Sequence, residues 1–327
     1  MSPDAEILAA LRAAGSGSVS AFELARALGV SRAAVSARIA DLRQLGFDIE
    51  SSPHLGYRLR GAPDMLIADD LLSRIGKIAV VGRDIQVFKK TTSTNDIVEK
   101  LARDGVAEGV VVFAESQTKG RGRLGRKWIS PTGAGLWFSI LLRPDLRPTE
   151  ATQLTVASAT ALRRAIAGHT GLNATIKWPN DVVVRGRKVA GILTELNAEL
   201  DRVRYLVLGI GVNVNLAALD FPPDLRKTAT SLSAECGRRI SRSELAACIL
   251  RELDRDYASI THGRFATVAD EWAANSSTLG CQLVIRIGER RVRGRAESLD
   301  EEGALLLRTE HGHLERVTGG DVSPEKS

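Results

Sequence analysis

The 327-residue chain contains few aromatic residues, only three cysteines and no long hydrophobic run. Cys236, Cys248 and Cys281 show no CxxC or other metal-ligand spacing, and such a sparse, odd set is typical of a reducing compartment. The first residues are partly acidic and have no basic stretch before an apolar core, so we do not expect a signal peptide. Since no apolar run approaches the length of a membrane span, the sequence predicts a cytoplasmic protein.

What is present is an ordinary globular composition with clustered positive charge. At 44% hydrophobic residues the chain can bury a sizeable core, and its length predicts two domains with room for a small third. The formal net charge of +6 permits contact with phosphates but does not by itself indicate nucleic-acid binding. The clustering is more informative, because several cations share one short segment: Lys119, Arg121, Arg123, Arg126 and Lys127.

Residues 1–62 have the pattern of a helix-turn-helix. Ser20 followed by Glu23 forms a capping box that predicts the start of a second helix, and Gly29 marks the turn after it. Ser31 would cap a third helix with an inward apolar stripe. Two short strand-like runs, at 48–50 and 57–59, predict a hairpin, so the segment is interpreted as a winged helix-turn-helix.

The exposed face of the third predicted helix is suited to DNA. Arg32, Ser36 and Arg43 fall on one side beside alanines, so the helix could approach a major groove closely. With Ser31, they are the candidate DNA-binding residues. The alternative is a small helical domain with a solvated basic face, because residues 1–62 hold seven arginines against six acidic residues.

Strand-like and helix-like patterns alternate in residues 63–275. Apolar runs of strand length lie at 110–113, 136–141, 182–184, 189–193 and 206–212. A helical pattern follows Pro148, and Gly186 lies in a predicted hairpin turn. Adjacent hairpin-linked strands predict a mixed α+β domain with helices on one face of the sheet, not a doubly wound parallel sheet.

The segment from Gln117 to Trp128, QTKGRGRLGRKW, contains the spacing GxGxxG. A dinucleotide site is excluded, because that motif should open a helix and loop residues follow here. Glycines such as Gly122 let a backbone wrap closely around a ligand, and Arg121 and Arg123 would bind phosphate or carboxylate oxygens. The segment therefore predicts an anion-binding loop, mobile without ligand, against the alternatives of a solvated basic loop or a nucleic-acid patch.

A second polar segment, KWPNDV, places Lys177, Asn180 and Asp181 near Lys188 around one predicted hairpin. If Lys177 is buried, it needs an anionic partner, which could be a ligand or simply a structural aspartate.

Two further segments can be explained with or without a ligand. Ser93, Thr94 and Asn95 precede a helical pattern, where Ser93 or Thr94 would suffice as a plain N-cap. Gly209 and Gly211 interrupt a buried strand that ends in Asn213-Val214-Asn215, which suggests that a ligand approaches the backbone closely.

Short strand-like runs separated by glycine-containing turns occupy residues 276–323. The predicted strands are Gln282–Ile287, Val292–Leu299, Ala304–Arg308 and Leu314–Val317. They indicate a small all-β domain, and we expect residues 324–327 to be disordered.

Taken together, these segments resemble a known family. TTSTND, QTKGRGRLGRKW, KWPNDV, RKVAGIL and GIGVNVN occur in the order found in biotin–protein ligases, and SRAAVSARIADLRQLGFDIESSPHLGYRL is similar to the DNA-binding domain of biotin-operon repressors. The resemblance covers nearly the whole chain. It implies an N-terminal winged helix-turn-helix (1–62), a catalytic ligase domain (63–275) and a C-terminal SH3-like β domain (276–323).

The resemblance also implies a reaction. Such ligases join biotin to ATP as biotinoyl-AMP and then transfer biotin to a lysine of a carboxylase biotin carrier domain, with Mg²⁺ as the expected metal. It assigns biotin contacts to Ser93, Thr94, Asn95, Gln117, Arg121, Gly122, Arg123, Lys188, Gly209 and Gly211. It assigns ATP contacts to Arg121, Arg123, Trp128, Lys177, Asn180 and Asn213. Lys188, Arg121 and Arg123 would be catalytic, and Asp181 is a candidate metal ligand or orients Lys177.

The implied regulation is a homodimer that binds operator DNA when biotin or its adenylate is bound. Three alternatives stay open at this point. The winged helix could have lost its DNA-binding role, the chain could sense biotin without turnover, or it could be a lipoate–protein ligase. The N-terminal segment and GRGRLGRKW argue against the lipoate enzyme, and Lys188 with the arginine-rich loop argues against a pure sensor.

Overall fold

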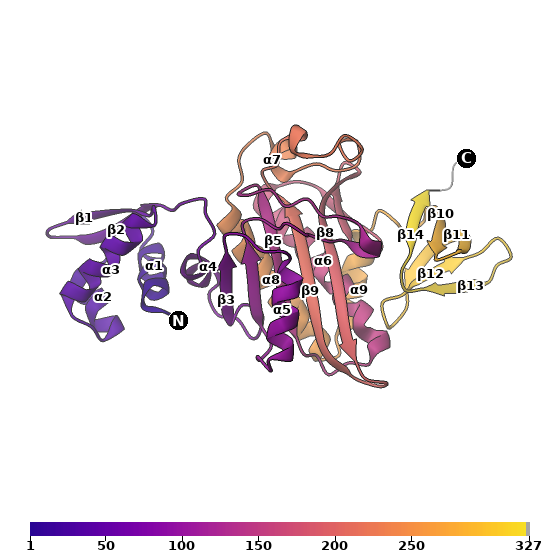
Figure 1. Ribbon diagram of the computed structural model, residues 1–327, viewed down its shortest axis with the longest axis horizontal. Coiled ribbons are helices and arrows are strands. Elements are labelled where there is room, and N and C mark those ends of the chain that lie inside the picture. Colours follow the sequence, from indigo (N-terminus) through magenta and orange to yellow (C-terminus); the bar gives the residue numbers. More distant parts are fainter. Residues whose placement is uncertain (325–327) are drawn as a thin grey trace. The chain divides into compact units, whose positions relative to one another are not determined.

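The computed structural model describes residues 1–324, which divide into two compact units (Figure 1). The first unit comprises residues 1–77 with 241–247, and the second comprises 78–240 with 248–324. No helix of the described residues is both long and apolar enough to cross a membrane.

The first unit is a three-helix bundle with a hairpin and a fourth helix. Its elements are α1 (Pro3–Ala13), α2 (Ala21–Leu28), α3 (Arg32–Gln44), β1 (Asp48–Ser52), β2 (Gly56–Gly61) and α4 (Ala68–Ile75). The capping box is confirmed: Ser20 Oγ accepts from Glu23 N at 3.1 Å, and Glu23 Oε2 accepts from Ser20 N at 2.9 Å. Gly29 ends α2 with a φ of +67°, a conformation that glycine adopts without strain. The predicted winged helix-turn-helix is therefore present.

The core of this unit is built from the apolar stripes of its helices. Ile7, Leu8, Leu24, Val35 and Ile39 are almost fully buried, and burial of each such side chain stabilises the fold by about 1.5–3 kcal/mol. Helix α4 also packs on α1, where Arg12 pairs with the buried Asp70. The compact unit thus extends to Lys77, beyond the domain boundary placed at residue 62.

The second unit contains a seven-stranded mixed sheet in the order β3-β4-β5-β9-β8-β7-β6. Its strands are β3 (Asp84–Phe88), β4 (Val110–Ala114), β5 (Gly135–Leu142), β6 (Ala174–Lys177), β7 (Asp181–Val184), β8 (Arg187–Ala198) and β9 (Val203–Asn213). Its helices are α5 (Thr94–Arg103), α6 (Ala151–Thr170), α7 (Leu232–Cys236), α8 (Arg242–Thr261, whose first turns belong to the first unit) and α9 (Phe265–Ala274). Only β3 and β4 pair in parallel, so the prediction against a doubly wound fold is confirmed.

The expectation that all helices cover one face of this sheet was wrong. Helix α5 packs through Val98 and Ala102 on Leu141 and Val207, whereas residues of α6 and α8 meet Ile140 and Leu208 on the opposite face. Figure 1 shows α5 in front of the sheet and α6, α8 and α9 behind it. Because side chains alternate along a strand, neighbouring apolar residues of β5 pack against helices on opposite faces of the sheet. A continuous apolar run such as 136–141 indicates a buried strand but does not show which helices cover each face.

The C-terminal part of this unit is a five-stranded antiparallel sheet in the order β13-β12-β11-β10-β14. Its strands are β10 (Gln282–Ile287), β11 (Arg290–Leu299), β12 (Leu305–Arg308), β13 (Leu314–Val317) and β14 (Asp321–Pro324). The last strand was not predicted, and it includes Pro324, which was expected to be disordered. The rest of that prediction, residues 325–327, lies outside the described residues.

Candidate active site

One cavity of about 900 Å³ in the second unit collects the predicted ligand-binding residues. Its lining includes every candidate for biotin, ATP and metal: Ser93, Thr94, Asn95, Gln117, Arg121, Gly122, Arg123, Trp128, Lys177, Asn180, Asp181, Lys188, Gly209, Gly211 and Asn213. They come from four segments spread over about 120 residues of sequence, so their convergence is a property of the fold.

Glycines on the α5 face of β8 and β9 form the floor of the cavity. A Cβ atom at Gly209 would lie 2.3 Å from Asn95 Oδ1, and one at Gly211 would lie 2.4 Å from the indole of Trp128. Gly191, which the sequence analysis overlooked, meets Lys188 and Trp128 in the same way, at 2.9 Å from each. The groups that lie close to these glycines are Asn95 and Trp128 of the chain itself, so the predicted approach of a ligand stays a prediction.

A network of polar side chains lies between α5 and the sheet. Thr94 Oγ1 is 2.7 Å from Ser139 Oγ, and Ser139 Oγ donates to Asn95 Oδ1 at 2.5 Å. Gln117 Oε1 accepts from the backbone N of Thr94 at 2.8 Å, and its Nε2 donates to the hydroxyl of Ser130 at 3.0 Å. The plain N-cap explanation is not supported, because Ser93 makes no side-chain capping bond. Such a network can hold a small polar ring in a defined orientation.

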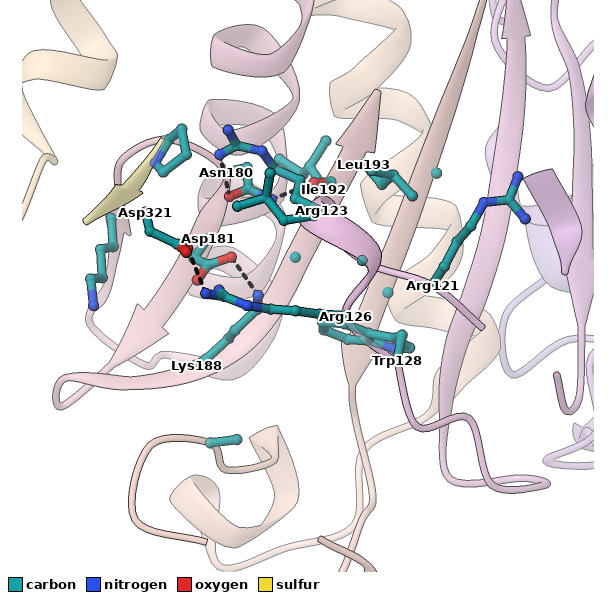
Figure 2. Close-up of a pocket in the computed structure, with 18 of the residues that line it drawn as sticks. Arg121, Arg123, Arg126, Trp128, Asn180, Asp181, Lys188, Ile192, Leu193 and Asp321 are labelled. Carbon is teal, nitrogen blue, oxygen red and sulfur yellow. Dashed lines mark hydrogen bonds and ion pairs between the residues drawn. The ribbon is translucent and has the colours of Figure 1, made fainter. Parts of the chain in front are cut away.

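Arg121 and Arg123 of the arginine loop (residues 119–128) lead in different directions (Figure 2). Arg121 Nε and Nη2 donate to the two oxygens of Glu195 at 2.9 and 3.0 Å, and Nη1 donates to Asp96 at 2.5 Å. Arg123 Nη1 instead donates to Asn180 Oδ1 at 3.3 Å, and burial lowers its pKa. Arg123 therefore lies with Asn180, Asp181 and Lys188 (Figure 2), whereas Arg121 is held on the other side by two carboxylates.

Lys188 occupies the centre of the cationic part of the cavity. Its Nζ lies 2.5 Å from Asp181 Oδ1 and 5.1 Å from the ring centre of Trp128, so it makes both an ion pair and a cation–π contact. Trp128 itself rests edge-on against Trp137, with ring centres 6.3 Å apart. The structure thus pairs Asp181 with Lys188, whereas Asp181 was expected to bind a metal or to orient Lys177.

The side chain of Lys177 lines the cavity but is exposed, so the argument that a buried lysine needs an anionic partner does not apply to it. Asn213 is buried, and its Nδ2 donates to the carbonyl of Thr230 at 3.1 Å. The amide nitrogen of Asn213 therefore contributes to the structure of the domain. Within the described residues, no group of three or more His, Cys, Asp or Glu side chains has the arrangement of a metal site.

The arginine loop is folded as a small hairpin. Gly122 N donates to Arg126 O at 2.7 Å, and Leu124 at its apex has a φ of +57° with its side chain exposed. Arg126 Nη2 pairs with Asp321 of β14 at 2.5 Å, and Arg286 of β10 reaches the same carboxylate at 3.3 Å. The C-terminal sheet therefore borders the cavity.

Several residues of this site were not predicted from the sequence. They are Ser139, Glu195, Gly191, Asp96, Arg286, Arg291, Arg293 and Asp321. A serine inside the apolar run LWFSILL was the one available signal, because a buried hydroxyl needs a hydrogen-bond partner. Asp96 lies in the motif TTSTND but was given no role, and the other charged residues carried no such signal, because they reach the cavity only through the packing of distant segments.

In the first unit, α3 presents the predicted DNA-facing residues to solvent. Arg32, Ser36 and Arg43 are exposed, as are the alanines at positions 33, 37 and 40. Ser31 Oγ accepts from Ala34 N at 3.1 Å, so its hydroxyl caps the helix. Arg43 Nε and Nη2 donate to Ile49 O at 2.8 and 2.6 Å, and Ser36 Oγ lies 2.9 Å from the hydroxyl of Tyr57. Arg43 and Ser36 thus contact the hairpin, whereas Arg32 makes no ion pair among the described residues.

Comparison with known proteins agrees with this arrangement. The chain matches the biotin/lipoate A/B protein ligase family over residues 87–213, an HTH domain over 5–58 and the biotin protein ligase C terminal domain over 279–323. The bifunctional ligase/repressor BirA of Bacillus subtilis is 37% identical over 311 residues, 94% of each chain. That of Escherichia coli is 30% identical over 302 residues, 92% of this chain and 91% of its own.

Among solved structures, the biotin protein ligase from Aquifex aeolicus in complex with biotin and ATP is 31% identical. It matches 75% of this chain and 100% of its own length, with a TM-score of 0.64. With relatives of this similarity over nearly its whole length, the chain belongs to the family of bifunctional biotin–protein ligases and repressors.

Proposed function

We propose that the cavity binds biotin and ATP side by side, forms biotinoyl-AMP, and transfers biotin to a lysine of a carboxylase carrier domain. The observation that carries the proposal is the position of Lys188. Its ammonium lies over Trp128 and beside the Arg123–Asn180 pair, above a glycine floor and within the same cavity as the polar network. The relative from Aquifex aeolicus was solved with both of these ligands.

The polar network is suited to the ureido ring of biotin. Thr94, Asn95, Gln117 and Ser139 offer donors and acceptors at fixed positions, and the missing side chain of Gly209 lets Asn95 lie close to the sheet. A buried, mutually bonded set of this kind selects a ligand by its hydrogen-bonding pattern, since an unmatched polar group would cost about 1–3 kcal/mol. We assign this end of the cavity to the biotin head.

The cationic part is suited to the first chemical step. A biotin carboxylate must approach the α-phosphate, and two unit charges about 4 Å apart repel by about 4 kcal/mol at an effective dielectric of 20. Lys188 and Arg123 supply positive charge there, so that an oxygen of the carboxylate can attack phosphorus while pyrophosphate leaves. Asp181 orients the Lys188 ammonium, and Trp128 would pack against the adenylate.

The remaining nucleotide contacts are assigned to Lys177, Asn180 and Asn213, which line the same cavity. The residues present do not fit a protein-bound Mg²⁺, because Asp181 is paired with Lys188 and Asp321 with Arg126. We therefore assign Mg²⁺ no ligand among the described residues of this chain.

In the second step, the amine of the acceptor lysine attacks the acyl carbon and AMP leaves. The experiment that tests this activity is an avidin blot of a biotin carboxyl carrier domain incubated with the chain, biotin and ATP. Labelling confined to the carrier lysine supports the proposal, and labelling only when lipoate replaces biotin would favour the related lipoate enzyme. Turnover also separates a ligase from a biotin sensor.

We further propose that the chain acts as a repressor in the form of a homodimer whose assembly biotinoyl-AMP favours. A two-fold dimer presents two copies of α3, so it should recognise an inverted repeat. The supporting observation is the exposed face of α3, where alanines flank Arg32. The test is binding to the upstream DNA of its own operon, with and without adenylate, at a stated salt concentration. Equal affinity in both conditions, with an unchanged dimer fraction in sedimentation, would leave only the ligase.

A further inference from the structure

We propose that Glu195 and Asp96 anchor the arginine loop through Arg121, and that this anchor sets how long the cavity retains biotinoyl-AMP. The inference rests on the proposed ligase function. It concerns two carboxylates that play no part in the chemistry described above, and it makes Arg121 a positioning residue and not a phosphate ligand.

The first observation is that every nitrogen of the Arg121 guanidinium is engaged. Nε and Nη2 meet the two oxygens of Glu195 in a parallel fork, and Nη1 meets Asp96 Oδ1 at 2.5 Å. Forked arginine–carboxylate pairs are among the more directional and stronger polar contacts in proteins. The hydrogen bond to Glu195 is the largest cause of a raised pKa for Arg121. The side chain of Arg121 is therefore held by Glu195 of β8 and Asp96 of α5.

The second observation is that the same carboxylate reaches the polar network of the cavity. Glu195 Oε2 accepts from Asn95 Nδ2 at 2.6 Å, and Asn95 Oδ1 accepts from Ser139 at 2.5 Å. Asp96 is the next residue of α5, and its other oxygen accepts from Thr92 Oγ1 at 3.1 Å. Glu195 thus joins the end of the cavity assigned to the biotin head directly to the base of the loop.

The third observation is the position of Arg121 within the loop. It forms a β-bridge with Lys127, and the backbone N of the next residue, Gly122, donates to the carbonyl of Arg126. The two strands of the loop therefore leave the domain at Arg121. Fixing this residue fixes the base from which Arg123 extends toward Asn180 (Figure 2). Releasing it removes the side-chain anchor at that base and leaves the loop held by the contacts of Arg123 and Arg126 and by the backbone bond from Trp128 to Gly120.

The experiment compares two variants with a matched control. Glu195→Gln keeps the shape of the side chain but loses its charge, and Asp96→Asn does the same on α5. Glu199→Gln is the control, because Glu199 lies just beyond the end of β8 and pairs with the exposed Arg204, away from the cavity. The full-length chain is loaded with labelled biotinoyl-AMP, and its release into excess unlabelled adenylate is timed. The rate of trypsin cleavage within residues 119–128 is measured in parallel.

We expect Glu195→Gln to release the adenylate about three- to tenfold faster, a moderate factor because the pair is partly exposed to solvent. Trypsin cleavage of the loop should accelerate with it, while the melting temperature stays near that of wild type. A variant that is merely less stable would instead lose melting temperature without a selective change in loop cleavage.

Two results would overturn the proposal. Release and cleavage rates equal to those of Glu199→Gln would show that the carboxylates anchor nothing. Slower release would show that they hold Arg121 away from the ligand. A wild-type chain that forms no biotinoyl-AMP would overturn the ligase function itself and with it the retention claim, an outcome recognised before any variant is made.

Discussion

The substitution Gly209→Ala would place a methyl group where Asn95 now lies. An ideal Cβ at position 209 is 2.3 Å from Asn95 Oδ1 and 3.0 Å from its Cγ and Nδ2. Asn95 is 4% exposed and is bonded to both Ser139 and Glu195, so it cannot move aside without breaking those bonds. Overpacking of this kind costs about 1–3 kcal/mol. A loss of that size in binding corresponds to a biotin affinity roughly 5- to 150-fold weaker.

The assay is titration calorimetry of biotin with the variant, accompanied by a thermal melt. Gly168→Ala is the matched control, because a Cβ there meets nothing within 4 Å and the residue lies inside α6. Alanine in a helix should raise stability by about 0.5–1 kcal/mol relative to glycine and leave biotin binding unchanged. If Gly209→Ala binds biotin as tightly as wild type, the glycine floor is not what admits the ligand.

Three further predictions concern single side chains. Lys188→Ala should reduce adenylation about a hundredfold or more, measured as pyrophosphate exchange, because one transition-state cation is lost; near-normal exchange would exclude Lys188 as the bridging charge. Arg32→Ala should weaken operator binding and flatten its salt dependence in a gel-shift series while leaving ligation intact; unchanged DNA affinity would remove α3 from the interface. Arg164→Ala should cost about 3–5 kcal/mol of unfolding free energy at pH 7, measured by urea titration. It removes the ion pair of Glu271 and leaves Glu252 and Asp256 with their longer pairs to Arg255. Because Arg164 lowers the pKa of Glu271, the loss should shrink as pH falls and this carboxylate protonates; a loss that stays constant with pH would contradict this.

Local patterns predicted most of the elements. Helix starts such as Ser20 and Ser31 carry their signal within four residues, because a cap bonds to the first turn that follows it. The hairpin around Gly186 was recognised for the same reason, since a tight turn needs positive φ at Arg185 and Gly186. The strand β14 was missed, because it is only four residues long and its pairing partners lie 35 to 41 residues earlier in the sequence.

The site was predicted where a motif is contiguous and missed where contacts cross the chain. KWPND and the arginine loop could be recognised as units, and the structure brings them to one cavity. The residues that these side chains contact could not be predicted from the sequence. Asp181 was expected to bind a metal or to orient Lys177, which it faces in the strand pair β6–β7, but its carboxylate pairs with Lys188, which faces Val183 in β7–β8. Glu195 lies 74 positions from Arg121, and no local periodicity relates the two.

The central claim is that the cavity around Lys188 activates biotin with ATP. Biotin-dependent exchange of labelled pyrophosphate into ATP, measured with the purified full-length chain and no acceptor protein, tests it directly. We expect exchange that requires biotin and that is lost in Lys188→Ala, while a chain with Glu199→Gln exchanges at the wild-type rate. Exchange that is absent in the wild type, or that proceeds equally well without biotin, would contradict it.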